Sequence, residues 1–288
     1  MTIDETAAPS PASAAVTAPS RTPSPAYRKY LATLRLRSFQ VMALQVGLVA
    51  LFVVWWEIAP RLGWVNAMLT SYPSAVIATL GRLIADGNLV VHTMATVTST
   101  VIGFVGGMAI GLIVAIALWL SPFLNRVLDP MIVVLNALPK IALVPIFFIW
   151  LGDQNSIYAM AVAVSVFVTI IMLYSGFQAI DPEKIKLARV YGASRFQLLS
   201  KIVLPGTVPT MISTLKINVG LSLVGVVVGE FQAAKAGLGY LITYGSQIFQ
   251  MNLVMTSLVV LAFISTLMFA AIQYLERFIY RRRGLGRV

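Results

Sequence analysis

Six long apolar stretches dominate the pattern of hydrophobic and polar positions along this chain of 288 residues. A helix needs about 20 consecutive apolar residues to cross a bilayer, where only a helix or a closed barrel satisfies every backbone polar group. The stretches are too long and continuous for the alternating strands, of about ten residues, in a membrane barrel. The pattern therefore predicts an all-α, polytopic membrane helical bundle of about six transmembrane helices, over residues 40–60, 94–118, 131–151, 157–178, 207–229 and 253–275.

Shorter segments flank these stretches. Ser71-Tyr72-Pro73-Ser74 is typical of a helix start, and helical spacing up to about Ile84 predicts a short helix on the membrane surface or beside the bundle. Gly237-Leu238-Gly239-Tyr240 predicts the opening of another short helix. Residues 1–27 are rich in Ala, Pro, Ser and Thr and cannot bury enough apolar surface to offset their ordering entropy, which predicts a disordered tail. The membrane domain is then expected over residues 28–288.

Composition agrees with a membrane protein and argues against an enzyme. Hydrophobic residues make up 59% of the chain and charged residues 11%, with a mean hydropathy of +0.88, whereas soluble domains are about 25% charged. The absence of cysteine excludes disulfides and thiolate metal sites. One histidine and no Gly-x-Ser-x-Gly leave no nucleophile–base pair or metal cluster, so we expect a non-catalytic protein that binds no cofactor of its own.

The basic residues predict the orientation. With six helices, both termini and the 119–130 and 179–205 loops share one side of the membrane. The opposite side collects only Arg61, Arg82 and Lys235. The positive-inside rule therefore puts both termini in the cytoplasm, and basic flanks facing anionic membrane lipid explain the net charge of +11 without nucleic acid. The cations of the cytoplasmic side are Arg21, Arg28, Lys29, Arg35, Arg37, Arg126, Lys184, Lys186, Arg189, Arg195, Lys201, Arg277, Arg281, Arg282, Arg283 and Arg287.

The cytoplasmic segment 181–205 is not a simple connector. Asp181 is a good N-cap, Pro182 suits a first helical position, and Gly192 is placed as a helix stop. A second short helix is expected from about Arg195 to Val203, ending at Leu204-Pro205. Such a helix pair is too short to span a membrane, and it can lie along the membrane surface or dock into a groove of a partner.

The residues of this segment resemble a family motif. A Gly, nine residues and then Ile-x-Leu-Pro is the spacing of the cytoplasmic loop motif of ABC importer permeases. The matching residues, which include the alanines on either side of the turn, are Ala188, Gly192, Ala193, Ile202, Leu204 and Pro205. The family motif begins Glu-Ala-Ala, whereas this chain has Lys186-Leu187-Ala188, so the acidic first position is lost.

The resemblance extends over roughly residues 70–275. Pro139 to Pro145 followed by Trp150-Leu151-Gly152, and Val228-Gly229-Glu230 followed by Gly237-Leu238-Gly239-Tyr240, look like the nitrate, sulfonate, taurine and bicarbonate branch of these permeases. That branch also includes permeases for thiamine-precursor pyrimidines and other aromatic compounds.

The resemblance implies a type I importer permease of the bacterial inner membrane. Such a permease works with a second permease copy, two ATPase subunits that bind ATP and Mg, and an extracytoplasmic substrate-binding protein. The 181–205 loop would be the coupling helix that sits in a groove of the ATPase. In agreement, the chain has no Gly-x4-Gly-Lys-Ser/Thr phosphate loop of its own.

Several polar or helix-breaking residues fall inside the predicted spans. Pro139 and Pro145 each free a carbonyl at membrane depth, and together with Asn136 they indicate either a pathway-lining break or a kink against a neighbouring helix. The glycines of the second span indicate close packing, within the chain or across a dimer, and they are Gly103, Gly106, Gly107 and Gly111.

Ionisable residues inside or near the ends of spans usually face a cavity or a partner. Lys216 is expected near the middle of the bilayer, where it could attract an anionic solute and Asn218 could hydrogen-bond one. Glu230 is expected at the outer end of its helix, at a gate. The structural alternative for Lys140, Lys216 and Glu230 is an ion pair within the chain or snorkelling to the headgroups.

A secondary transporter or channel is the alternative function. It would need paired intramembrane carboxylates or inverted hydropathy repeats, and the sequence has neither. The resemblance to ABC importer permeases implies an ATP-driven importer of a small, anionic solute, which is the leading hypothesis.

Overall fold

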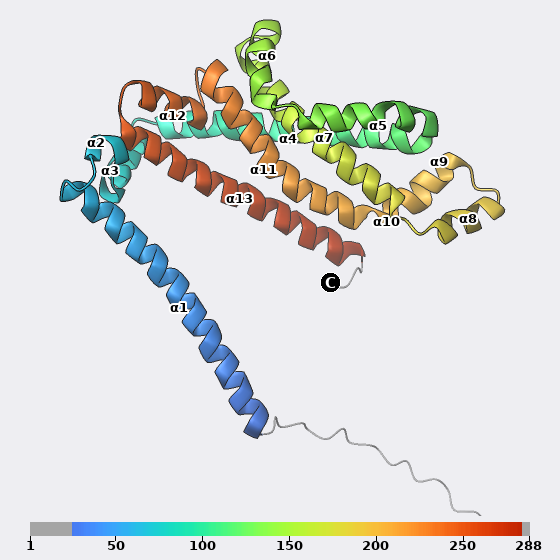
Figure 1. Ribbon diagram of the computed structural model, residues 1–288, viewed down its shortest axis with the longest axis horizontal. Coiled ribbons are helices and arrows are strands. Elements are labelled where there is room, and N and C mark those ends of the chain that lie inside the picture. The colour runs from blue at the N-terminus through green and yellow to red at the C-terminus, as the bar shows by residue number, and fades with distance from the viewer. Residues whose placement is uncertain (1–24, 284–288) are drawn as a thin grey trace, which may run out of the picture. The chain divides into compact units, whose positions relative to one another are not determined.

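A computed structural model describes residues 25–283, which form a series of helices joined by short connections (Figure 1). The long helices are α1 Pro25–Arg61, α4 Asn88–Leu120, α7 Asp153–Gln178, α11 Val208–Ala233 and α13 Met251–Arg283. The shorter elements are α2 Ala67–Thr70, α3 Pro73–Ala85, α5 Pro122–Ala137, η1 Lys140–Leu143, α6 Val144–Leu151, α8 Pro182–Val190, α9 Arg195–Leu198, η2 Leu199–Val203, α10 Leu204–Gly206 and α12 Leu238–Gln247.

The described residues divide into two units at Trp55–Trp56. The first unit is most of α1, and its side chains from Phe39 to Val54 are exposed although nearly all are apolar. An exposed apolar surface of this kind fits a hydrocarbon environment. α1 begins at Pro25, so the predicted tail ends earlier than residue 27; the rest of that tail lies outside the described residues.

The core of the second unit is formed by α4, α7 and α11, which pack closely along most of their length. Small residues permit this approach. A Cβ added at Gly103 of α4 would overlap the Ala161 side chain of α7, and one at Gly225 of α11 would lie 2.7 Å from the Ala161 Cα. The glycines of α4 therefore pack within the chain, which resolves one alternative left open by the sequence.

The order of these contacts gives the direction of each helix. Gly103 meets Ala161 and Gly111 meets Thr169, so α4 and α7 run parallel. The chain leaves α4 at one end of the bundle and starts α7 at the other. Residues 121–152 must therefore return across the bundle, and they do so as one broken crossing.

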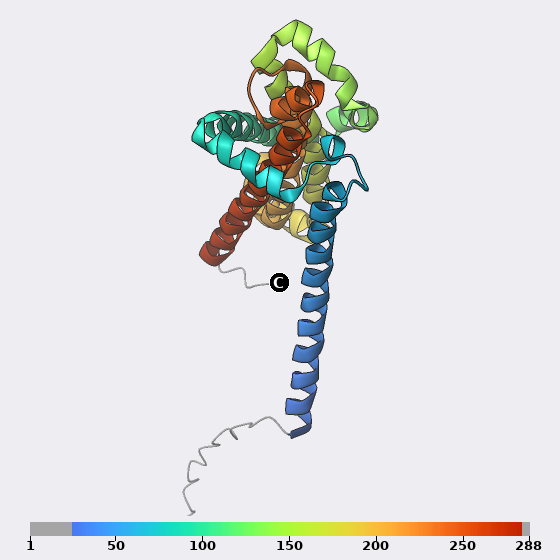
Figure 2. The same ribbon diagram turned by 90° about the vertical axis from the view of Figure 1, so that its left-hand side faces the viewer.

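The returning segment corrects the prediction of a single helix over residues 131–151. α5 starts at Pro122, inside what was expected to be a loop, and ends at Ala137; η1 and α6 then continue at an angle of 90° to it (Figure 2). The break falls where Pro139 follows Leu138, because a residue before proline is driven out of the α conformation and proline has no N–H to donate.

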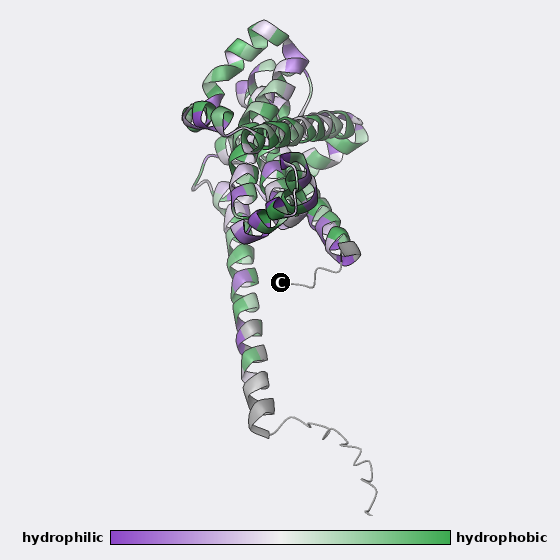
Figure 3. Cartoon of the chain, turned by 90° about the vertical axis from the view of Figure 1, so that its right-hand side faces the viewer, coloured by the Kyte–Doolittle hydropathy of each residue, from purple (hydrophilic) through white to green (hydrophobic). Residues whose placement is uncertain are grey.

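Among residues 25–283, five helices are long and apolar enough to cross a membrane, and the bent pair of α5 with η1–α6 adds a sixth when it is counted as one span. Hydrophobic residues dominate the long helices (Figure 3), and many of the large ones are exposed. The predicted short helices at residues 71–84 and 237–240 are confirmed as α3 and α12. The fold is thus an all-α, polytopic helical bundle.

Candidate coupling loop and membrane pathway

The loop between α7 and α11 opens with α8, whose two ends are fixed locally. The Asp181 carboxylate accepts a hydrogen bond from the Glu183 N–H at 2.9 Å, which caps the first turn. At the other end Gly192 adopts φ +81°, and the N–H groups of Gly192 and Ala193 donate to the carbonyls of Arg189 and Ala188. This is a Schellman turn, and it explains the spacing of Ala188, Gly192 and Ala193.

The second arm of the loop runs through α9, η2 and α10 and is anchored in the bundle. Ser194 and Gln197 form a capping box that starts it. Leu199 and Val203 are buried with Ala115 of α4 and Leu173 and Phe177 of α7, and Leu204 packs against the same cluster. Of the remaining motif residues, Ile202 is partly buried and Pro205 is exposed.

The expected end of this arm at Leu204-Pro205 is wrong, because the helix continues to Gly206. A π-type turn precedes the proline, with the Leu204 N–H bonded to the Leu199 carbonyl. Such a wider turn accommodates a proline ring that would clash with the carbonyl four residues earlier in a regular helix.

The tip of the loop presents an apolar surface that no other described part of the chain covers. α8 contains no buried residue. Val190 is 83% exposed and Tyr191 84%, and Leu187 and Phe196 are also exposed. We refer to Leu187, Val190, Tyr191 and Phe196 as the loop tip.

The break between α5 and α6 gathers four of the residues singled out in the sequence. Lys140 extends its ammonium back to the Asn136 carbonyl at 2.7 Å, which satisfies a carbonyl at the end of α5. The same ammonium lies 5.8 Å from the centre of the Phe167 ring of α7. Pro139 precedes η1, and Pro145 sits in the first turn of α6, where the missing N–H costs nothing.

Lys216 and Asn218 lie on α11, and both have partners within the chain. The Lys216 ammonium forms an ion pair with Glu276 of α13 at 2.7 Å. The Asn218 amide donates to the Thr169 hydroxyl of α7, and Asn218 is fully buried. Glu276 was not singled out in the sequence because the last helix was expected to end at residue 275, whereas α13 reaches Arg283.

Glu230 is 2% exposed and ties α11 to the start of α12. Its carboxylate accepts from the Thr96 hydroxyl and from the Gly239 N–H, each at 2.8 Å. The Thr96 hydroxyl accepts from the Leu238 N–H at 2.8 Å, and His92 Nδ1 accepts from the Gly237 N–H at 3.0 Å. The first three N–H groups of this helix start are therefore all satisfied by side chains of α4 and α11.

The end of the bundle opposite the loop also holds an exposed ion pair. Lys235, in the link between α11 and α12, pairs with Asp153 at the start of α7 at 2.7 Å. The hydrogen bond and the charge of Asp153 raise the pKa of the Lys235 ammonium.

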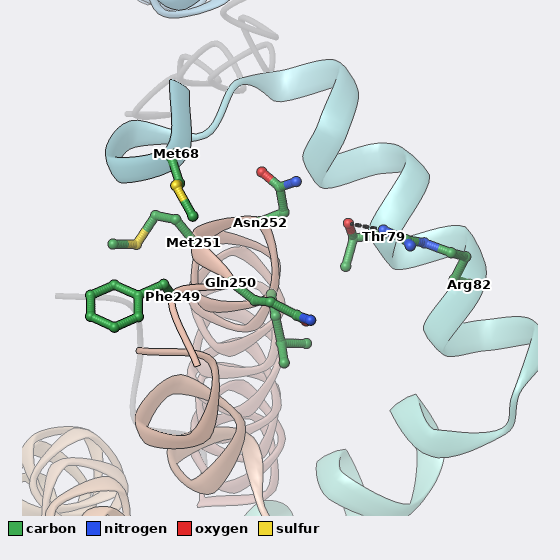
Figure 4. Close-up of a pocket in the computed structure, with 8 residues that line it drawn as sticks. Met68, Thr79, Arg82, Phe249, Gln250, Met251 and Asn252 are labelled. Carbon is green, nitrogen blue, oxygen red and sulfur yellow. Dashed lines mark hydrogen bonds between the residues drawn. The ribbon is translucent and has the colours of Figure 1, made fainter. Parts of the chain in front are cut away.

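A cavity of about 310 Å³ opens at the same end, between α2, α3 and the start of α13 (Figure 4). Arg82 donates to the Thr79 hydroxyl at 3.0 Å, a bond drawn in the figure. Gln250 and Asn252 add polar groups to the lining, while Met68 and Phe249 add apolar ones.

Most of this bundle matches the sequence pattern of a known protein family. Residues 107–284 match the family described as "Binding-protein-dependent transport system inner membrane component". The chain belongs to this family. Its members are permeases, the membrane subunits of ABC transporters, so the chain is a permease.

Two permeases show the breadth of the relatives. The "Taurine transport system permease protein TauC" of Escherichia coli is 27% identical over 243 residues, covering 82% of this chain and 88% of the relative. The "Riboflavin transport system permease protein RibX" of Chloroflexus aurantiacus is 28% identical over 253 residues, covering 86% and 94%. The taurine relative agrees with the resemblance to the nitrate, sulfonate and taurine branch.

Solved structures confirm the fold of the permease. A chain of a bacterial alginate ABC transporter, solved with its alginate-bound periplasmic protein, superposes with a TM-score of 0.61 at 14% identity, covering 84% of this permease and 96% of that chain. The bundle is therefore the type I ABC importer permease fold that the motif predicted.

Proposed function

We propose that the 181–205 loop couples this permease to its ATPase subunits by docking the loop tip into a groove on the ATPase. The loop tip is apolar, exposed and carried on a helix with no buried residue. Exposed apolar residues gathered on one protrusion mark a partner site. The second arm is packed into α4 and α7, so a force on the tip is transmitted to the bundle core.

The proposal fixes the orientation of the permease. The loop and the C-terminal end of α13 lie at the cytoplasmic face, and α1 crosses once so that its N-terminal end lies there too. The parallel run of α4 and α7 supports this, because it makes the broken α5–α6 segment a full crossing. The opposite end, with the cavity beside Arg82, then faces the extracytoplasmic substrate-binding protein.

The complete importer comprises two permease copies, two ATPase subunits that bind ATP and Mg, and the substrate-binding protein. In this chain the translocation pathway is proposed to pass the α5–α6 break, where Asn136, Pro139, Lys140 and Pro145 interrupt the helix. Lys216 gives no support to an anionic solute, because its charge is paired with Glu276. The anionic solute stays a prediction, and the relatives named for taurine and riboflavin support a small organic solute.

Co-purification with the cognate ATPase subunit tests the docking proposal. The variant Val190→Ser/Tyr191→Ser is expected to lower ATPase capture and permease-stimulated ATP hydrolysis about tenfold, as for truncation of interface anchors. The control Leu62→Ser/Trp64→Ser changes one aliphatic and one aromatic residue that are also exposed, at 59% and 69%, at the opposite end, and capture of the ATPase should stay unchanged. Wild-type capture by the loop-tip variant would refute the proposal.

A further inference from the structure

Three arginines line one cavity at the root of the loop. Arg126 comes from α5, Arg189 from α8 and Arg195 from α9, and the cavity has a volume of about 320 Å³. α5 starts at the same end of the bundle as α8 and α9 (Figure 1). The rest of the lining contains no acidic residue and consists of Leu118, Trp119, Pro122, Asn125, Tyr174, Gln178 and Ile185.

The positive charge of this cavity is uncompensated within the described residues. None of the three guanidinium groups forms an ion pair there, although the chain pairs other cations such as Lys216 and Lys235. Among residues 25–283, Arg195 alone of the three has a hydrogen-bond partner for its guanidinium group, the Leu120 carbonyl at 3.1 Å, which holds it at the end of α4. All three residues are exposed, so solvent screens part of the repulsion between their like charges, and an anion between them removes the rest.

Asn125 supplies a second, independent indication of a ligand. Its Oδ1 is buried and has no hydrogen-bond partner among the described residues, although buried polar atoms are almost always bonded. The amide oxygen and nitrogen exchange places when the side chain turns over. Asn125 lines the same cavity as the arginines, so its amide group can donate N–H bonds to an anion with several acceptor oxygens.

We propose that this cavity binds a tetrahedral oxyanion, either the phosphate headgroup of an anionic phospholipid or a soluble phosphate-like anion of the cytoplasm. Guanidinium groups bind phosphate and sulfonate oxygens in pairs, which suits three arginines better than single-atom anions. The ligand joins α5, which leads into the broken crossing, to both arms of the loop. Occupancy therefore stiffens the attachment of the loop to the bundle, independently of whether the loop tip docks an ATPase.

The test uses the full-length permease alone in nanodiscs, so that no ATPase carboxylate can occupy the site. One arm titrates inorganic phosphate into permease in phosphatidylcholine nanodiscs by calorimetry. The other counts retained phosphatidylglycerol by native mass spectrometry after extraction from mixed nanodiscs. The variant is Arg126→Gln/Arg189→Gln/Arg195→Gln, and the control is Lys184→Gln/Lys186→Gln/Lys201→Gln, which removes the same charge from exposed sites outside the cavity lining.

We expect the arginine variant to weaken binding about tenfold or more in at least one arm, with the lysine control close to wild type. Loss in the calorimetric arm identifies a soluble anion, and loss of retained lipid identifies a headgroup. Equal binding by wild type and the arginine variant in both arms, or an equal loss in the lysine control, would overturn the proposal. If the triple variant does not fold, Arg189→Gln alone is expected to weaken binding about threefold, and unchanged binding overturns the proposal.

Discussion

Two short helices at opposite ends of the bundle, α8 and α12, are built in contrasting ways. α8 has nine residues and buries none of them. α12 has ten residues and buries Leu238, Gly239, Leu241 and Gly245. The N-terminal N–H groups at the α12 start are bound by side chains of α4 and α11, whereas α8 is capped by its own Asp181.

The contrast indicates where each helix finds its stability. Isolated helices of this length are marginal in water, so each needs support from packing. α12 is stabilised by packing and hydrogen bonds with other helices of its own chain. α8 keeps only local caps and an exposed apolar tip, which is expected of a helix that packs against another subunit.

The largest expected effect is a difference in stability between alanine substitutions at two glycines of positive φ. Gly237→Ala at the α12 start places a Cβ against the Glu230 carboxylate and strains φ +132°, so we expect a loss of about 3–5 kcal/mol in the free energy of unfolding. Gly192→Ala at the end of α8 meets no atom within 4 Å and should cost only about 1–2 kcal/mol for its left-handed backbone. Chemical unfolding in micelles measures both, and equal losses would contradict the contrast.

The next effect tests the hydrogen bonds that hold the start of α12 against α4 and α11. Thr96→Val keeps the side-chain shape but leaves the Leu238 N–H and one Glu230 oxygen without the hydroxyl, at a cost of about 1–3 kcal/mol in unfolding free energy. Thr93→Val on the same helix is the matched control. The Thr93 hydroxyl is buried without a partner in the described residues, so its removal should be neutral or stabilising. If Thr93→Val lowered the free energy of unfolding as much as Thr96→Val, the hydrogen bonds of Thr96 would not be what stabilises the start of α12.

A smaller effect is expected in α8. Asp181→Ala removes the N-cap and should weaken this helix by about 1 kcal/mol. Because α8 buries nothing, the loss should appear as faster amide hydrogen exchange in residues 183–190 with the unfolding midpoint of the whole chain unchanged. A lowered global midpoint would show that α8 is integral to the bundle.

The smallest effect concerns the exposed Lys235–Asp153 pair beside the α12 entry. Lys235→Met should lower the unfolding midpoint only slightly, since exposed ion pairs stabilise little. Asp153 raises the pKa of Lys235, so the contribution is fully present below the unfolded-state pKa near 10.5 and is lost as pH rises through the higher folded-state pKa. Midpoints of wild type and variant should therefore converge in strongly alkaline buffer and differ most at neutral pH.

The long helices could be predicted from hydropathy because hydrocarbon imposes length and apolarity on each of them. The shape of the returning crossing could not, since Pro139 and Pro145 permit either a kink or a break, and the outcome also depends on contacts with helices distant in the sequence, such as those of α5 with α4 and α7. The partner of Lys216 was missed for a related reason. Glu276 lies beyond the apolar run, in a helical extension that hydropathy does not mark.

The loop was predicted well at its caps and less well in its packing. Asp181 and Gly192 act through their immediate neighbours, so local sequence defines both ends of α8. The continuation of the helix through Pro205 depends on the π-type turn before it and on burial of Leu199 and Val203 against two other helices. Long-range contacts of this kind leave no signature in the spacing of the motif.

A single introduced cysteine tests the central claim most directly, because the sequence contains none of its own. Tyr191→Cys, labelled with a membrane-impermeant maleimide in vesicles of known sidedness, should react only from the cytoplasmic side and be protected when the ATPase subunit is bound. Lys235→Cys should react from the opposite side, with or without the ATPase. Labelling of Tyr191→Cys that the ATPase leaves unchanged, or that occurs from the outer side, would contradict the assignment of α8 as the coupling helix.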